Sequence, residues 1–296
     1  MTDPIETVVQ TYLDVPSQPK LVLPANACDS HVHVFGPRTR FPYSPLRKST
    51  PAEAPKEKLF ALHQKLGIAR CVIVQSVMHG YDNAVVEDAI EAGGGRYLGV
   101  ALTDVDVSTQ ELKRLAGRGF RAARFHFMAH ISGGYDVTDV LKLTPKLADV
   151  GMHLQVHFES ALVHTVGQQL QQSAVPVVID HMGRVDATKG EGHEDFQALM
   201  RLLDHAKVHV KVSGIDRIEA TSRAGSGYPL GTQLAAQLLE RFPDQCVWGL
   251  DWPHPNHTHV PDDGELVDAL SRIAPTSALL EKLLVHNPQT LYRFTS

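Results

Sequence analysis

Two histidines stand two residues apart in the run Ala27–Phe35 (ACDSHVHVF), which has the apolar and β-branched composition of a buried strand. Because alternate residues of a strand point to the same side, His31 and His33 would project together. Two imidazoles at this spacing can bind one divalent metal ion. The pattern also fits two core histidines that hydrogen-bond to the backbone, so the pair alone leaves both interpretations open.

Further histidine and aspartate residues close later apolar runs, at His157, His181 and Asp251. If these runs are parallel strands of one barrel, their carboxyl ends share a rim and the side chains can converge. Imidazole and carboxylate ligands with an open coordination position suit a catalytic Zn²⁺, which activates water and polarises a carbonyl group. We therefore expect the His31/His33 pair to bind the metal together with His157 and Asp251. Asp251 would take the proton of the attacking water, and His181 would hydrogen-bond the oxyanion or hold the water.

Short runs rich in β-branched and apolar residues recur along the whole chain. They are Ala27–Phe35, Cys71–Val77, Tyr97–Asp104, Phe120–Phe127, Met152–Phe158, Pro176–Gly183, Val208–Gly214 and Cys246–Pro253. Segments with helical periodicity separate most of them, for example Pro55–Leu66, Asn83–Ala92, Ser108–Leu115, Asp139–Val150, Ala161–Gln172, Glu194–Ala206 and Gly231–Phe242. This alternation predicts an α/β fold with a parallel sheet, and eight such units predict a closed (β/α)₈ TIM barrel. No Gly-x-Gly-x-x-Gly follows the first run, which argues against a dinucleotide-binding domain.

The chain is expected to form one barrel domain, residues 24–296, preceded by an extended N-terminal arm, residues 1–23, that contains several prolines. The segment Gly36–Pro51 is a long loop directly after the first strand. Long loops at the carboxyl ends of barrel strands often form part of an active-site lid. A passive surface loop is the alternative.

Composition excludes several classes of protein. The net charge is −5 and the basic residues are scattered, so we expect no nucleic-acid partner. The apolar runs are too short to cross a membrane, and the N-terminus lacks the pattern of a signal peptide. A cytoplasmic enzyme is the resulting expectation. The three cysteines have no paired spacing and are interpreted as small core residues.

Three motifs, in order along the chain, resemble those of the amidohydrolase superfamily of the amidohydrolase-2 type. They are Asp29–Pro37 (DSHVHVFGP), Asp180–Arg184 (DHMGR) and Gly249–Asn256 (GLDWPHPN). Within the superfamily they are similar to the branch that contains 2-pyrone-4,6-dicarboxylate lactonase, and the similarity runs from Pro24 to Phe294. The resemblance implies a hydrolase that opens a carboxylated lactone from aromatic-compound catabolism, a small anionic substrate.

The resemblance also implies roles for individual residues. The strand-8 aspartate, here Asp251, would be the general base, and Arg124 and Arg217 would bind substrate carboxylates. For each arginine a structural salt bridge at the barrel rim is the alternative. We expect four further polar residues to line the substrate pocket, namely Ser76, His79, His130 and Asn256. A serine hydrolase is not expected, because the chain has no Gly-x-Ser-x-Gly motif.

Two positions depart from this branch of the family. The branch carries tyrosine where this chain has His157 and works without metal, whereas histidine is typical of zinc-dependent decarboxylase relatives. We therefore predict one bound divalent ion, Zn²⁺. The run Met128-Ala129-His130 replaces basic residues, which extends the expected substrates to muconolactone-type or sulfonated lactones. A metal-dependent non-oxidative decarboxylase is the alternative enzyme, and a non-catalytic metabolite-binding barrel is the alternative outside enzymes.

Overall fold

The computed structural model describes residues 7–128, 135–219, 223–257 and 259–294. Its main sheet has eight strands in the order β10-β9-β8-β7-β6-β5-β4-β2, and every neighbouring pair is parallel. The strands are β2 (Cys28–Val32), β4 (Arg70–Val74), β5 (Tyr97–Leu102), β6 (Phe120–Phe127), β7 (His153–Phe158), β8 (Val177–Ile179), β9 (Val208–Lys211) and β10 (Cys246–Val247). The predicted TIM barrel is confirmed.

The barrel closes between the segment after β10 and the first barrel strand, β2. The backbone N–H of Ser30 donates to the carbonyl of Trp248 at 2.8 Å, and that of Asp251 donates to the carbonyl of His31 at 2.7 Å. Gly249 makes this approach possible, because a Cβ atom at that position would lie 2.5 Å from the backbone nitrogen of His31. The closure therefore brings the carboxylate-bearing segment directly against the His-x-His strand.

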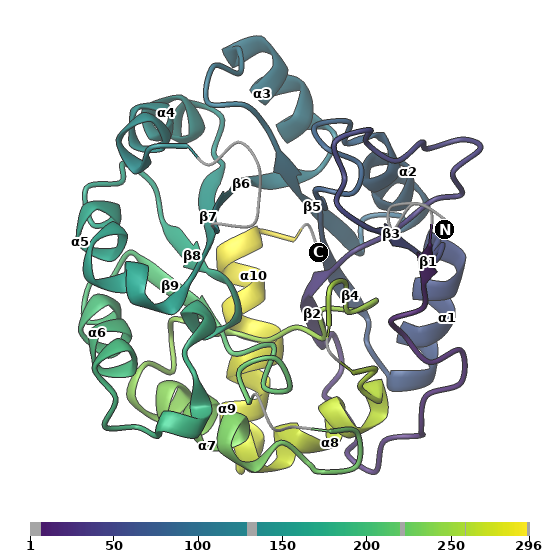
Figure 1. Ribbon diagram of the computed structural model, residues 1–296, viewed down its shortest axis with the longest axis vertical. Coiled ribbons are helices and arrows are strands. Elements are labelled where there is room, and N and C mark those ends of the chain that lie inside the picture. Colours follow the sequence, from purple (N-terminus) through teal and green to yellow (C-terminus); the bar gives the residue numbers. More distant parts are fainter. Residues whose placement is uncertain (1–6, 129–134, 220–222, 258, 295–296) are drawn as a thin grey trace.

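Helices surround the strands, as Figure 1 shows. They are α1 (Lys56–Leu66), α2 (Ala84–Ala92), α3 (Thr109–Gly117), α4 (Val137–Asp149), α5 (Val166–Leu170), α6 (Glu194–Leu203), α7 (Pro229–Arg241) and α8 (Asp263–Ile273). Side-chain caps mark several helix starts. Ser108 accepts a hydrogen bond from the N–H of Glu111 at α3, and Asp262 accepts one from that of Gly264 at α8. The apolar faces of the helices pack on the strands and form one large core.

A continuous helical segment ends the described chain: α9 (Ser277–Glu281), η4 (Lys282–His286) and α10 (Asn287–Tyr292). In Figure 1 α10 (yellow) is seen through the ring of strands. Its fully buried Tyr292, together with Phe294, forms a separate apolar cluster with strand residues such as Cys28, Val72 and Val100. The C-terminal segment thus closes one end of the barrel, and the sequence analysis did not foresee it.

Every barrel strand except β6 is shorter than the run predicted for it, and β8 and β10 are shortened most. β8 ends at Ile179 and gives way to the 3₁₀ segment η2 (Asp180–Arg184), while β10 ends at Val247. Residues after both strands adopt positive φ angles, which lie outside extended β geometry. The predicted helix Ala161–Gln172 is also interrupted, because η1 (Ser160–His164) and α5 meet at a kink.

The N-terminal segment lies across the outside of the barrel. Its short strand β1 (Val8–Val9) pairs with β3 (Thr50–Pro51) at the end of the loop Gly36–Pro51. The backbone N–H of Ser17 donates to Asp262, at the start of α8. The division of the chain at residue 23 stays a prediction.

Two expectations concern the chain as a whole. No helix among the described residues is both long and apolar enough to span a membrane. Cys28, Cys71 and Cys246 are buried and free, as predicted for small core residues.

Candidate active site

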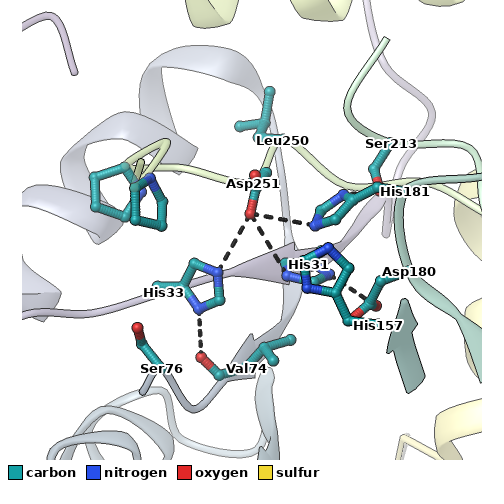
Figure 2. A network of polar contacts seen from close by, with 12 residues as sticks. His31, His33, Val74, Ser76, His157, Asp180, His181, Ser213, Leu250 and Asp251 are labelled. Carbon is teal, nitrogen blue, oxygen red and sulfur yellow. Dashed lines mark hydrogen bonds and ion pairs between the residues drawn. The ribbon is translucent and has the colours of Figure 1, made fainter. Parts of the chain in front are cut away.

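Three histidines surround one carboxylate oxygen at the carboxyl ends of the strands (Figure 2). Oδ1 of Asp251 lies 3.3 Å from Nε2 of His33, 3.5 Å from Nε2 of His31 and 3.7 Å from Nε2 of His181. All four residues are buried, with exposed fractions of 3% or less. The structure therefore brings together four of the five residues that the sequence predicted for the centre.

The backbone aims these side chains by leaving regular strand geometry. Asp251 follows β10 with a φ of 68°, and His181 follows β8 with a φ of 48°. Non-glycine residues rarely adopt this left-handed conformation, which costs free energy and persists where the surroundings enforce it. In both places the turn directs the side chain toward the imidazole of His31, whose ring centre lies 4.5 Å from that of His181.

Charge and burial set the protonation of the centre. Burial alone would raise the pKa of Asp251, but the guanidinium of Arg217 lowers it well below its ordinary value. The contact is direct, because Nε of Arg217 donates to Oδ2 of Asp251 at 2.7 Å. Burial lowers the pKa of His181 to about 3, and that of His31 also falls well below the ordinary value. At neutral pH the centre thus holds an ionised carboxylate beside the neutral imidazoles of His31 and His181.

A second buried carboxylate, Asp180, lies on the side of His31 away from Asp251. Its Oδ2 accepts hydrogen bonds from Nε of Arg124 at 2.8 Å and from Nε2 of Gln155 at 3.1 Å. Nζ of the fully buried Lys211 lies 3.4 Å from its Oδ1. Burial tends to raise the pKa of Asp180, and the cations Arg124 and Lys211 lower it well below its ordinary value. Asp180 and its partner Lys211 therefore contact His31 on the side of the ring opposite Asp251.

Both arginines predicted to bind substrate carboxylates are engaged with carboxylates of the protein. Arg124 pairs with Asp180, and Arg217 pairs with Asp251 while its Nη2 donates to the carbonyl of Pro255 at 3.1 Å. The structure thus realises the salt-bridge alternative for each of them. A role of either arginine toward substrate stays a prediction.

By distance alone the centre could hold a metal ion. The ligand atoms of His31, His181 and Asp251 all lie within 4.8 Å of one another. His157, the predicted additional ligand, is not part of this group, and its Nδ1 lies 3.5 Å from Nη2 of Arg124. Its ring centre is 5.5 Å from that of His181.

The hydrogen-bond partner of Nδ1 differs between His31 and His33. This partner decides whether Nε2 of the same ring is free to bind a metal. A metal-binding histidine usually donates its second ring N–H to a carbonyl or carboxylate. His33 has this arrangement, because its Nδ1 lies 2.7 Å from the carbonyl oxygen of Val74. Behind His31 the hydrogen-bond partner of Nδ1 is instead Nζ of Lys211, at 3.2 Å. Oδ1 of Asp180 also lies 3.2 Å from Nδ1 of His31. His31 could bind a metal through Nε2 only with its ring proton on Nδ1, facing Asp180, whereas the hydrogen bond from Lys211 to Nδ1 leaves the proton on Nε2.

The predicted pocket residues lie at different places. Ser76 is buried near His33, and its Oγ accepts from the N–H of Met78. Nδ1 of His79 lies 3.2 Å from the carbonyl of Pro42, and its Nε2 accepts from the N–H of Gly36 at 3.4 Å. His79 therefore holds the loop Gly36–Pro51. Asn256 is exposed and joins the same loop, accepting from Ser49 at 3.2 Å. The predicted residue His130 lies outside the described residues.

Two functional candidates were missed by the sequence analysis. Arg184, in η2, forms no hydrogen bond or ion pair with another described residue; burial lowers its pKa, as does the positive charge of Arg217. Its place in the DHMGR motif was a usable signal. Lys211 also had a signal, because in the run VHVKVSG it falls on the same strand face as Ser213, at a position where a buried strand seldom carries a cation.

Comparison with known proteins identifies one matching family and several similar hydrolases. The family model described as amidohydrolase matches residues 28–294. The chain is 40% identical over 284 residues to a 2-pyrone-4,6-dicarboxylate hydrolase of Comamonas testosteroni, covering 94% of this chain and 93% of the relative. It is 37% identical over 277 residues to a 4-sulfomuconolactone hydrolase of Hydrogenophaga intermedia, covering 92% of this chain and 90% of the relative.

A crystal structure with the same architecture comes from Acinetobacter baumannii. It is that of a probable 2-pyrone-4,6-dicarboxylic acid hydrolase with citric acid bound. It superposes with a TM-score of 0.80 at 25% sequence identity and covers 91% of this chain and 100% of that one. With the family match spanning nearly the whole barrel, this chain belongs to the amidohydrolase family.

Proposed function

We propose that the protein hydrolyses a small lactone bearing carboxylate or sulfonate groups, formed in the breakdown of aromatic compounds. The observation that carries the proposal is the convergence of three imidazoles on Oδ1 of Asp251 at the carboxyl-terminal mouth of the barrel. The names of the two related enzymes support the substrate class, since both are hydrolases of anionic cyclic esters.

In the proposed reaction Asp251 is the general base. Arg217 holds its Oδ2, so Oδ1 remains directed at the histidines and can take a proton from a water molecule. The resulting hydroxide attacks the lactone carbonyl carbon. The ring C–O bond breaks in the following step, as protonated Asp251 returns its proton to the leaving oxygen. His181 is well placed to hydrogen-bond the developing oxyanion or to hold the water, and Ser213 fixes its ring at 3.0 Å from Nδ1.

Arg184 is our candidate for binding the anionic substituent of the lactone. A partly buried guanidinium beside another arginine is unfavourable unless an anion neutralises it. Among the described residues no carboxylate forms a direct ion pair with Arg184, although Asp251, Asp216 and Glu159 favour its charge from a greater distance, whereas Arg124 and Arg217 each contact one directly.

No step of this proposal uses the zinc ion predicted from sequence, because Lys211 donates to Nδ1 of His31 and leaves the ring proton on Nε2, where a metal would bind. A metal bound at the centre would supply a Lewis acid for the carbonyl. The histidines can instead act through their own hydrogen bonds.

The test is a screen of anionic lactones by ultraviolet absorbance, since ring opening changes conjugation. 2-Pyrone-4,6-dicarboxylate and 4-sulfomuconolactone are the first two compounds, and Asp251→Asn provides the site-specific control. We expect turnover of at least one of them by the wild-type protein and none above background by the variant. Release of carbon dioxide without ring opening would instead identify the decarboxylase alternative.

A further inference from the structure

Lys211 is a buried cation to which the proposed reaction assigns no role. It ends β9 and is fully buried directly behind the His-x-His strand. Its Nζ lies 2.9 Å from the carbonyl oxygen of Ser30, 2.9 Å from Oε1 of Gln155 and 3.2 Å from Nδ1 of His31. Burying an ammonium group costs several kcal/mol, on the order of the penalty for any buried ion, so its partners must compensate.

The hydrogen bonds of Lys211 determine which ring nitrogen of His31 carries the proton. An ammonium group has three N–H donors and no acceptor. Two of them meet the carbonyl oxygens of Ser30 and Gln155. The third N–H has Nδ1 of His31 at 3.2 Å and Oδ1 of Asp180 at 3.4 Å, and only the contact with Nδ1 is a hydrogen bond. Nδ1 must then be the acceptor, which leaves the proton of the neutral ring on Nε2.

Asp180 is the competing neighbour of the same nitrogen. Its Oδ1 lies 3.2 Å from Nδ1 of His31, but it accepts no hydrogen bond from any described residue. The other oxygen, Oδ2, takes the hydrogen bonds of Arg124 and Gln155. Asp180 thus neutralises the charge of Lys211 without claiming the ring proton of His31.

His33, the other histidine of the pair, carries a ring proton on the opposite nitrogen. Nδ1 of His33 donates to the carbonyl oxygen of Val74, which can only accept, so Nδ1 of His33 carries a ring proton. Nε2 of His31, by contrast, is a buried N–H donor that lies 3.5 Å from Oδ1 of Asp251 but forms no hydrogen bond with it or with any other described residue. A buried donor that makes no hydrogen bond is rare in folded proteins and calls for a functional explanation.

We propose that Lys211 is a positioning residue that holds His31 as its Nε2–H tautomer, so that His31 donates a hydrogen bond to the carbonyl oxygen of the bound lactone. The two histidines of the pair then differ, because His31 carries its proton on Nε2 and His33 carries one on Nδ1. The donor stabilises the negative charge that develops on the carbonyl oxygen during attack. This inference rests on the proposed lactone hydrolysis for the identity of the acceptor, but the tautomer itself is a property of the resting protein.

The tautomer is tested by NMR of protein labelled with ¹⁵N in the histidine rings. The His31 signals are assigned by their loss in His31→Asn. In the wild-type protein we expect the proton of His31 on Nε2 and that of His33 on Nδ1. A proton on Nδ1 of His31 in the wild-type protein overturns the proposal, whether or not any lactone is turned over. Absence of turnover with the expected tautomer would count against the proposed function alone.

Lys211→Met removes the donor at nearly constant side-chain length. We expect the His31 proton to move to Nδ1, where Asp180 can accept it, and kcat to fall by about ten- to hundredfold with little change in KM. Gln155→Met is the matched control, because it disturbs the same buried network but leaves the contact between Lys211 and His31. Its His31 proton should stay on Nε2. An equal tautomer change in both variants, or none in Lys211→Met, contradicts the proposal; if Lys211→Met does not fold, the wild-type spectrum still decides.

Discussion

The two ends of the barrel are built from the same strands but serve opposite purposes. At one end the C-terminal segment fills the interior with apolar groups, and Tyr292 and Phe294 pack on residues such as Val72. At the other end the interior holds ionised and hydrogen-bonding groups, with Asp180 and Asp251 both buried. The first arrangement stabilises the fold through burial of apolar surface, while the second costs free energy that the rest of the molecule must offset.

Positive φ angles of non-glycine residues are concentrated at the polar end, although Asn26 and Arg293 beside the closed end also have them. After β8 and β10, at the polar end, His181, Arg184 and Asp251 have positive φ angles. Such conformations are unfavourable for these residues and persist where tertiary contacts enforce them. The closed end and the helical shell therefore supply stability. The polar end, called the open end below, uses that stability to hold side chains in reactive positions. Substitutions at the two ends should therefore affect different measurements.

The largest expected effect on activity comes from Asp251→Asn at the open end. The amide keeps the shape of the side chain but cannot accept the proton of water, so kcat should fall by about 10²- to 10⁴-fold. The thermal unfolding midpoint should change much less than in a variant of the closed end. Steady-state kinetics and a thermal melt of the same sample test this. Near-normal turnover by the variant would exclude Asp251 as the base.

Tyr292→Ala at the closed end should have the reverse effect. Removing a fully buried aromatic ring leaves a cavity and typically costs about 3–5 kcal/mol of the free energy of unfolding. Tyr292→Phe is the control, because it keeps the ring and removes only the hydroxyl, which has no hydrogen-bond partner among the described residues. Urea unfolding measures both variants. We expect kcat/KM of the folded fraction to stay within about threefold of wild type. A loss of kcat/KM in the folded protein would contradict the conclusion that the closed end serves stability alone.

The open end also marks where sequence reasoning succeeded and where it stopped. Strand alternation placed His31 and His33 correctly, and barrel topology placed His181 and Asp251 beside them. The ion pairs of Arg124 and Arg217 could not be read from sequence, because Asp180 and Asp251 reach them only through tertiary contacts. The tautomer of His31 likewise depends on Lys211, which is 180 residues away along the chain.

Arg184→Met tests whether substrate charge is recognised at the open end. Loss of a charge-assisted hydrogen bond to a carboxylate or sulfonate costs about 1.5–3 kcal/mol, which corresponds to a rise in KM of about ten- to hundredfold. Because the guanidinium lacks a partner among the described residues, the folded protein should lose little stability. Kinetics with an anionic lactone and with its uncharged methyl ester distinguish a loss of charge recognition from a general loss of activity. An equal loss for both substrates would rule out recognition of the charge.

The buried imidazoles should make the stability of the protein depend on pH. His181 has a pKa of about 3 in the folded protein, against about 6.5 in an unfolded chain. Between these values the unfolded chain binds a proton that the folded protein does not, so stability falls as pH decreases, by about 1.4 kcal/mol per pH unit. Urea unfolding between pH 6 and 4.5 should therefore show a shallower slope in His181→Asn than in wild type. Equal slopes would mean that His181 is not buried in its neutral form.

The smallest expected effect is that of metal removal, and it distinguishes the sequence prediction from the structure. The sequence predicted a zinc ion on His31, His33, His157 and Asp251. In the structure Lys211 donates to the ring of His31, and the positive charge of Arg217 already neutralises Asp251. We therefore expect dialysis against a chelator to leave kcat and KM unchanged, with less than one equivalent of zinc in the purified protein by elemental analysis. A loss of activity that added Zn²⁺ restores would show that the centre rearranges around an ion, and that the His-x-His pair acts as the sequence alone suggested.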